Sequence, residues 1–278
     1  MSILLFSLLV LLGSLLAGFL GSLTGLGGGV VIVPLLALAF HVDMRYAIGA
    51  SLVSVIATSS GAAAAYVREG YSNMRIGMFL EIATTIGALA GAFIATRVAT
   101  STIAIVFGVV LLFSAYLSIK GQPPVNADQA QDRVSRFLRL DGSYPTTQGA
   151  EKYTVHRIPL GFGLMFGAGT LSGLLGIGSG AVKVLAMDQA MRIPFKVSTT
   201  TSNFMIGVTA AASAGVYLAR GYIEPGIAMP VVLGALGGSM LGAKVLVKAR
   251  TRVLRFVFSA VIVALGAEMI FNGFTGRL

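Results

Sequence analysis

Two glycine-rich clusters are the residues in this chain best suited to binding a ligand. GLGGG covers residues 25–29 and GIGSG covers residues 176–180, and a short apolar run follows each. Free backbone N–H groups at the beginning of a helix bind oxyanions, and glycine lets an anion approach them closely. The candidate anion-binding residues are Gly27, Gly28 and Gly29 in the first cluster and Gly178, Ser179 and Gly180 in the second. The alternative is that the glycines only permit a tight bend and close packing.

Lys183 is the most distinctive single residue. It comes three positions after the second cluster, in the middle of an apolar run. A cation inside a membrane costs at least about 2.5 kcal/mol and points to a function. We predict that Lys183 binds the anion or acts as a charge gate. The alternative is a side chain that extends to the membrane surface.

Hydroxyl and amide side chains form a second group of candidates. KVSTTTSNFMIGVTA places Ser202 and Thr209 on one helical face with Asn203 beside it, and Ser51 and Thr58 have the same spacing in an earlier segment. Such groups can replace the hydration shell of an oxyanion. Helix packing by small polar residues is the alternative, except at Asn203, whose larger amide favours a ligand role.

Glu81 is an acid within an apolar segment. It could carry a coupling proton. Its place near one end of the segment instead favours a side chain that reaches the surface or pairs with an arginine.

The elements that must position these residues occur twice. When residue 23 is laid on residue 174, LTGLGGGVVIV falls on LLGIGSGAVKV, and the register continues without a gap. It pairs Arg45 with Lys196 and extends as far as Phe107 and Phe258. A duplication in apolar segments is typical of membrane transporters that build a site between their halves.

The composition indicates a helical membrane protein. The chain is 56% hydrophobic and 11% charged, with a mean hydropathy of +0.89. The apolar segments are about 3–25, 29–40, 47–67, 75–97 and 102–119 in the first repeat and about 157–175, 180–190, 197–218, 226–247 and 254–273 in the second. The net charge of +10 lies mainly in short loops, which is typical of membrane topology rather than of nucleic-acid binding.

The predicted fold is an all-α polytopic membrane protein with two inverted five-segment repeats. We divide it into a first repeat (1–119), a cytoplasmic linker (120–156) and a second repeat (157–278). An odd number of segments inverts the second repeat, and this arrangement puts most basic residues on one face. Both termini are then outside. The second segment of each repeat spans only about half of a ~30 Å hydrocarbon core, which predicts a broken helical hairpin whose bend is rich in glycine.

These motifs resemble a known family. GLGGGVVIVPLL followed by RYAIGASLVSVIATSSGAAAAY, with GLLGIGSGAVKV followed by FKVSTTTSNFMIGVTAA, is similar to the two repeats of the TauE/SafE (sulfite exporter, TSUP) family of bacterial membrane proteins. The resemblance implies export of small sulfur-containing anions across the cytoplasmic membrane. It supports as motif residues Gly27, Gly28, Gly29, Gly178 and Gly180.

The sequence therefore predicts a secondary transporter, an exporter of a small anion such as sulfite or an organosulfonate, in the bacterial cytoplasmic (inner) membrane. Its expected partners are that substrate and the lipid bilayer, with no nucleic acid, and a coupling proton or ion and a homo-oligomer are left open. A passive anion channel and a non-transporting scaffold or sensor subunit are the alternatives. No nucleophile–base pair and no metal-ligand spacing is present, so we expect neither an enzyme nor a cofactor.

Overall fold

The computed structural model describes residues 3–24, 28–68, 70–120, 133–138, 140–146, 149–246 and 251–276, and most of these residues are helical. The long helices of the first repeat are α1 (Ile3–Thr24), α3 (Met44–Arg68), α4 (Met74–Ala95) and α5 (Thr100–Lys120). Those of the second are α7 (Ile158–Leu175), α9 (Phe195–Ala219), α10 (Pro225–Leu246) and α11 (Thr251–Thr275). They agree with the apolar segments predicted from the sequence.

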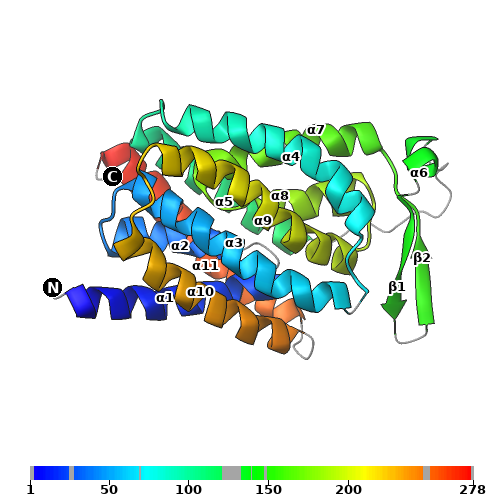
Figure 1. Cartoon of the computed structure of the whole chain (residues 1–278), viewed down its shortest axis with the longest axis horizontal. Coiled ribbons are helices and arrows are strands. Elements are labelled where there is room, and N and C mark those ends of the chain that lie inside the picture. Colours follow the sequence, from blue (N-terminus) through cyan, green and yellow to red (C-terminus); the bar gives the residue numbers. More distant parts are fainter. Residues whose placement is uncertain are drawn as a thin grey trace.

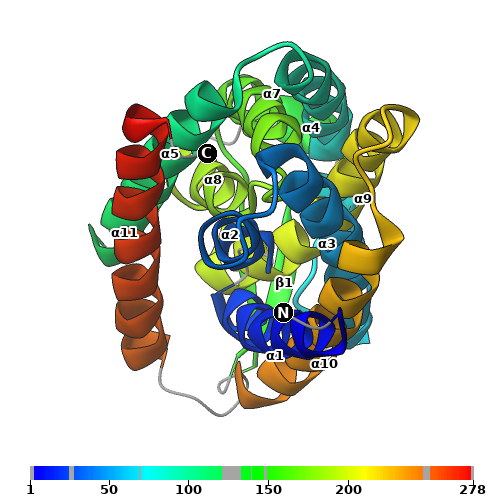
Figure 2. The ribbon, with the colours of Figure 1, turned by 90° about the vertical axis from the view of Figure 1, so that its left-hand side faces the viewer.

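The main helix pairs each join one helix of the first repeat to one helix of the second. α1 lies along α10, and its counterpart α7 lies along α4. α3 packs against its own counterpart α9, and α5 against its counterpart α11. Figure 2 shows the pair α5 and α11 on one side of the bundle, with α3 and α9 on the other. Each half of the chain therefore buries its apolar surface largely against the other half.

Glycine allows the closest of these contacts. A Cβ atom on Gly87 or Gly91 of α4 would collide with the backbone of α7, at Phe166 O and Thr170 O respectively. The matching Gly238 of α10 would collide in the same way with Leu15 O of α1. Small residues let helix backbones approach in this manner within a membrane. The glycines repeated in the sequence therefore mark the lines along which the helices touch.

Two matching contacts between a cation and an aromatic ring also join the repeats. The Arg45 guanidinium lies 5.6 Å from the centre of the Tyr222 ring. The Lys196 ammonium lies 5.7 Å from the centre of the Tyr71 ring. Arg45 and Lys196 occupy equivalent positions in the two repeats. Each therefore contacts a tyrosine of the other repeat.

The predicted half-helices are present in both repeats. They are α2 (Gly29–Pro34) with η1 (Leu35–Ala39), and α8 (Gly180–Leu185) with η2 (Ala186–Ala190), where η denotes a π-helical turn. Equivalent hydrogen bonds close the two turns, from Val42 N to Leu36 O at 3.0 Å and from Ile193 N to Met187 O at 2.9 Å. Pro34 lies in α2 but has no proline counterpart in α8, so proline does not cause the π turn.

The described part of the linker contains one helix and one hairpin. A short helix, α6 (Arg133–Leu138), precedes an antiparallel hairpin of β1 (Gly142–Thr146) and β2 (Gly149–Tyr153). The hairpin departs from the all-α expectation, although the apolar bundle itself is helical (Figure 1). Asn73, which caps α4, holds the hairpin: its Nδ2 donates to Tyr153 OH at 2.8 Å and to Leu140 O at 3.0 Å.

The outer surface of the bundle is apolar. Large side chains such as Phe113 and Phe271 are exposed. In the described part of the chain, five helices are long and apolar enough to cross a membrane: Leu4–Ser22, Met74–Ala95, Ile158–Leu175, Phe195–Ala219 and Pro225–Gly242. An apolar exterior around long apolar helices is what a lipid environment requires.

Candidate functional site

A pocket lined mainly by residues of polar type lies between the two repeats. It contains about 240 Å³ of space not filled by protein atoms, and this volume includes some space beyond the mouth of the pocket. The described residues that line it are Ser22 of α1, Gly28 before α2, Thr58 and Ser59 of α3, Asn203 and Ile206 of α9, and Ser239 of α10. The pocket is narrow, with room for about one water molecule at its core.

The hydroxyl groups of the pocket bond to their own helices. Thr58 Oγ1 donates to Val55 O at 3.2 Å, and Ser239 Oγ donates to Leu236 O at 2.9 Å. A hydroxyl can rotate away from such a carbonyl and donate to a ligand instead. These side chains are therefore available as neutral donors, at the cost of a weak local hydrogen bond.

Asn203 is the pocket residue whose donors are unused. It is 3% exposed, and its Nδ2 has no hydrogen-bond partner within the described structure. Leaving a buried amide unsatisfied costs about 1–3 kcal/mol, and a ligand in the pocket would remove this cost by accepting from Nδ2. An acceptor with negative charge is the partner that its two N–H bonds would hold most strongly.

The second glycine cluster forms a tight bend. Gly178 has φ +66° and Ser179 has φ 47°, so both adopt the left-handed conformation that side chains disfavour. Ser179 is 1% exposed, and among the described residues its Oγ has no hydrogen-bond partner. A Cβ atom on Gly178 would come within 2.5 Å of Ile206, which lines the pocket. The bend therefore lies directly behind the pocket wall.

The first cluster is described only in part. Gly27 lies outside the described residues. Gly28 lines the pocket. Gly29 instead packs closely, since a Cβ atom there would lie 2.6 Å from Ser51 Oγ and 2.9 Å from Gly176 O.

Ser51 and Ser202 occupy matching positions but bond differently. Ser51 Oγ donates to Gly176 O at 2.8 Å, across the boundary between the repeats. Ser202 Oγ donates to Gly180 O at 3.4 Å, within its own repeat. Both are fully buried, and both hold a glycine-rich bend in place.

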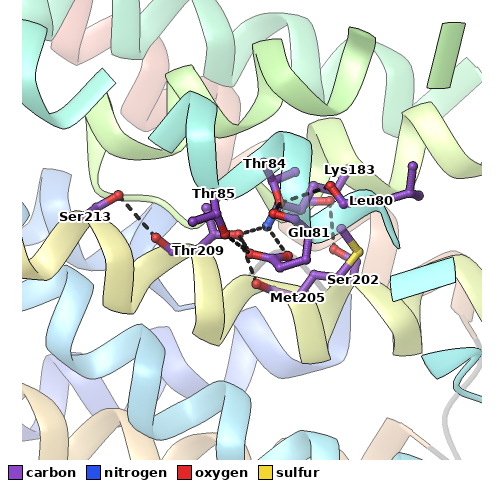
Figure 3. A network of polar contacts seen from close by, with 10 residues as sticks. Leu80, Glu81, Thr84, Thr85, Lys183, Ser202, Met205, Thr209 and Ser213 are labelled. Atoms are coloured by element: carbon purple, nitrogen blue, oxygen red, sulfur yellow. Dashed lines mark hydrogen bonds and ion pairs between the residues drawn. The ribbon is translucent and has the colours of Figure 1, made fainter. Parts of the chain in front are cut away.

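Lys183 lies in a buried polar network, and the described lining of the pocket does not include it. The side chain is 0% exposed, so it does not reach the surface. Its Nζ donates to Thr209 Oγ1, which donates in turn to Glu81 Oε1, and Nζ lies 3.9 Å from Glu81 Oε2 (Figure 3). Thr85 Oγ1 also donates to Oε1, at 3.2 Å. The network joins α4, α8 and α9.

The interpretation of Glu81 from the sequence is wrong. Glu81 is 7% exposed and pairs with a lysine, not with an arginine or with solvent. The side of α4 on which Glu81 lies explains why the prediction failed. Glu81 faces α9 inside the bundle, whereas the next residue, Ile82, is exposed. The second repeat gives no hint of it, since Val232 occupies the equivalent position.

Five of the predicted residues fall into two groups, and the others that are described lie at the glycine-rich bends. Gly28, Thr58 and Asn203 line the pocket, whereas Lys183 and Thr209 lie in the network with Glu81. Sequence reasoning missed Ser22 and Ser239 as pocket residues. Each has a non-polar counterpart in the other repeat, so the search for repeated polar residues passed over them.

The fold and the pocket define the class: a multi-pass helical membrane protein with a polar site between its halves. The family model described as sulfite exporter TauE/SafE matches residues 10–269, and the chain belongs to this family of membrane transporters. Its relatives carry the names of transporters, not of enzymes.

Three relatives extend over most of the chain. The probable membrane transporter protein YunE of Bacillus subtilis (strain 168) is 30% identical, over 96% of this chain and 98% of its own. YdhB of the same strain, also named a probable membrane transporter protein, is 25% identical over 85% and 89%. MJ0441 of Methanocaldococcus jannaschii, with the same description, is 26% identical over 96% of each chain. No solved structure matches this chain.

Proposed function

We propose that this protein is a secondary transporter that exports a small sulfur-containing anion, such as sulfite or an organosulfonate, across the bacterial cytoplasmic membrane. The observation that carries the proposal is the buried Asn203 amide, whose Nδ2 has no partner among the described residues and which lines a pocket between the repeats. The family name is consistent with this substrate class.

The pocket is suited to a small oxyanion. Several rotatable hydroxyls and one amide surround it, and oxygen atoms of a sulfite or sulfonate group can accept from each. Neutral donors bind an anion without the strong attraction that would prevent its release. The apolar side chain of Ile206 completes the wall and offers a surface for the carbon end of an organosulfonate.

The narrowness of the pocket favours a transporter over a passive channel. Its core has room for about one water molecule, so an anion enters only if the surrounding helices move. A site that must open and close for each substrate is the property of alternating access.

We also propose that the two repeats, 1–119 and 157–278, are inverted, with the 120–156 linker in the cytoplasm and both termini outside. The course of the chain supports this: α1 and α7, equivalent helices, run in opposite directions along the molecule (Figure 1). The beginning of α1 and the end of α11 lie at one end of the bundle, and the β-hairpin lies at the other.

A binding screen tests the function. The purified protein would be heated with sulfite, thiosulfate, sulfate, ethanesulfonate and acetate in turn, and its loss of helical circular dichroism recorded. We expect stabilisation by one or more of the sulfur anions and little by acetate, because binding to the folded state raises the unfolding temperature. Stabilisation by none of them would overturn the proposed substrate class.

Transport in proteoliposomes then separates transporter from channel. We expect flux of the stabilising anion to saturate with its concentration and to accelerate when the same anion is present on the opposite side. A flux that rises linearly and shows no such exchange would indicate a channel instead.

A further inference from the structure

The network of Glu81, Thr209 and Lys183 holds two opposite charges in the interior of the bundle. The Lys183 side chain is fully buried, and that of Glu81 is 9% exposed. Intramembrane ionisable residues are costly and mark ion or substrate pathways. A pair of this kind is not needed for packing, since apolar residues of similar volume would fill the same space with equal or greater stability.

Glu81 has an oxygen atom available for a proton. Oε1 accepts from Thr85 and Thr209, whereas Oε2 accepts no hydrogen bond within the described residues and only faces Nζ at 3.9 Å. A proton on Oε2 would neutralise the carboxylate and change the charge of the pair from zero to +1. No bond in the network has to break first, because Thr209 stays between the two groups.

Few other charges face the pair. α4 packs against α7 and α9. The described residues of α7 include no ionisable side chain. The other ionisable groups on α4, α9 and η2 are Arg75, Lys196, Tyr217 and Asp188. α8 also contacts α5, whose ionisable residues, Tyr116 and Lys120, lie near its end. Arg75 lies at the beginning of α4, and Lys196 and Tyr217 lie near the two ends of α9. Asp188 lies on η2, five residues after Lys183. Glu81 is the acid that the structure places against Lys183, with Oε2 at 3.9 Å from Nζ.

The Glu81–Lys183 pair lies close enough to the pocket for an anion there to change its proton binding electrostatically. Asn203 and Ile206 line the pocket, and Thr209 follows on the next turn of α9. At ~1.5 Å per residue, Asn203 and Thr209 are about 9 Å apart along the helix axis. At about 10 Å and an effective dielectric constant of about 20, an anion would strengthen proton binding by the pair about ten- to twentyfold.

We infer that Glu81, Thr209 and Lys183 form a proton-binding site coupled to the anion pocket, so that the anion and a proton bind together. This inference rests on the proposed function. By thermodynamic linkage, the protonated pair also strengthens anion binding by the same factor. The proton comes from solvent, forms an O–H bond at Glu81 Oε2 and returns to solvent when the anion leaves. Anion and proton consequently move in the same direction, so the outward gradient of the anion, and not the inward gradient of protons, drives export.

Calorimetry tests this coupling on the purified full-length protein. Ethanesulfonate and thiosulfate are suitable probes, because both remain ionised from mildly acidic to mildly basic solution and carry no proton of their own. Binding heats measured in two buffers with different ionisation enthalpies give the number of protons taken up per anion. We expect a maximum net uptake of about 0.5 to 0.6 proton per anion in the wild-type protein, because a ten- to twentyfold coupling allows no more.

Glu81→Gln should bind the probe with no proton uptake, since the amide keeps the shape of the side chain but cannot be protonated in this range. Glu268→Gln is the matched control: Glu268 is an exposed acid on α11, so this variant should take up protons as the wild type does. If Glu81→Gln does not fold, the double variant Glu81→Gln/Lys183→Met removes both charges and should likewise bind without proton uptake.

Each other outcome overturns the inference. Wild-type binding without proton uptake throughout this pH range would refute the coupling and leave the proposed function standing. Unchanged uptake in Glu81→Gln or in the double variant would assign the proton to another group. A wild-type protein that binds neither probe, nor sulfite, would refute the proposed function and the coupling with it.

Discussion

Removing one charge of the Glu81–Lys183 pair should destabilise the protein far more than removing both. At the observed 3.9 Å between Nζ and Oε2, the attraction is about 4 kcal/mol for an effective dielectric constant of about 20. Glu81→Gln removes it and leaves a fully buried ammonium bonded to Thr209. Lys183→Met leaves a buried carboxylate. Breaking such a pair costs about 3–5 kcal/mol.

The double variant Glu81→Gln/Lys183→Met has no buried charge left to desolvate. We expect its stability to lie within about 1 kcal/mol of the wild type, or above it, because apolar replacements of buried ion pairs are often neutral or stabilising. The coupling energy between the two positions should then be at least about 5 kcal/mol, the summed cost of the two single variants less that of the double variant.

Reversible unfolding by dodecyl sulfate in mixed micelles, followed by far-ultraviolet circular dichroism, measures these differences. The chain has no Trp and no Cys, so indole fluorescence and thiol-reactive dyes are not usable. Two single variants whose costs simply add in the double variant would refute the reasoning, because the side chains would then contribute independently of each other.

Further predictions concern packing, binding and topology. Gly91→Ala should cost about 1–3 kcal/mol because its Cβ would meet Thr170 O on α7; Gly163→Ala, which meets nothing within 4 Å, is the control and should not destabilise the same unfolding transition. Asn203→Leu should lower anion affinity at least about tenfold in the binding assay while stability stays equal or rises, since the amide is unsatisfied; loss of stability with normal affinity would give Asn203 a structural role. In intact cells, Cys at Ser143, exposed on β1, should resist an impermeant thiol reagent while Cys at Arg220, exposed after α9, should react; the reverse pattern would contradict the proposed topology.

The helices could be predicted from the sequence because their signals are local. Apolar segments of membrane length and the glycine breaks at 25–29 and 176–180 fix the ends of the helices and the two half-helices. The π turns and the β-hairpin were not predicted. A π turn depends on how the half-helix meets the following loop, and the hairpin is two short strands with no repeat partner.

The candidate site was predicted only in part, for a different reason. Thr58 and Gly28, which were predicted from residues matched between the repeats, and Asn203, which was predicted from its larger amide, all line the pocket. The partner of Lys183 was missed because a single sequence carries no direct record of which distant side chains meet. Ser22 was missed because its importance comes from the helix packed against it, not from its neighbours in the chain.

The unequal bonding of Ser51 and Ser202 has a consequence for turnover. Ser51 holds the bend of the other repeat at Gly176 O, while Ser202 holds its own at Gly180 O. If each repeat adopted the conformation that the other has here, Ser202 would donate to the bend of the first repeat. Ser51 would then donate to Gly29 O within its own repeat. One hydrogen bond between the repeats would break and an equivalent one would form, so the two conformations would differ little in energy. A transporter that alternates between two conformations needs them to have similar free energies. A strong preference for one conformation would make the transition to the other slow.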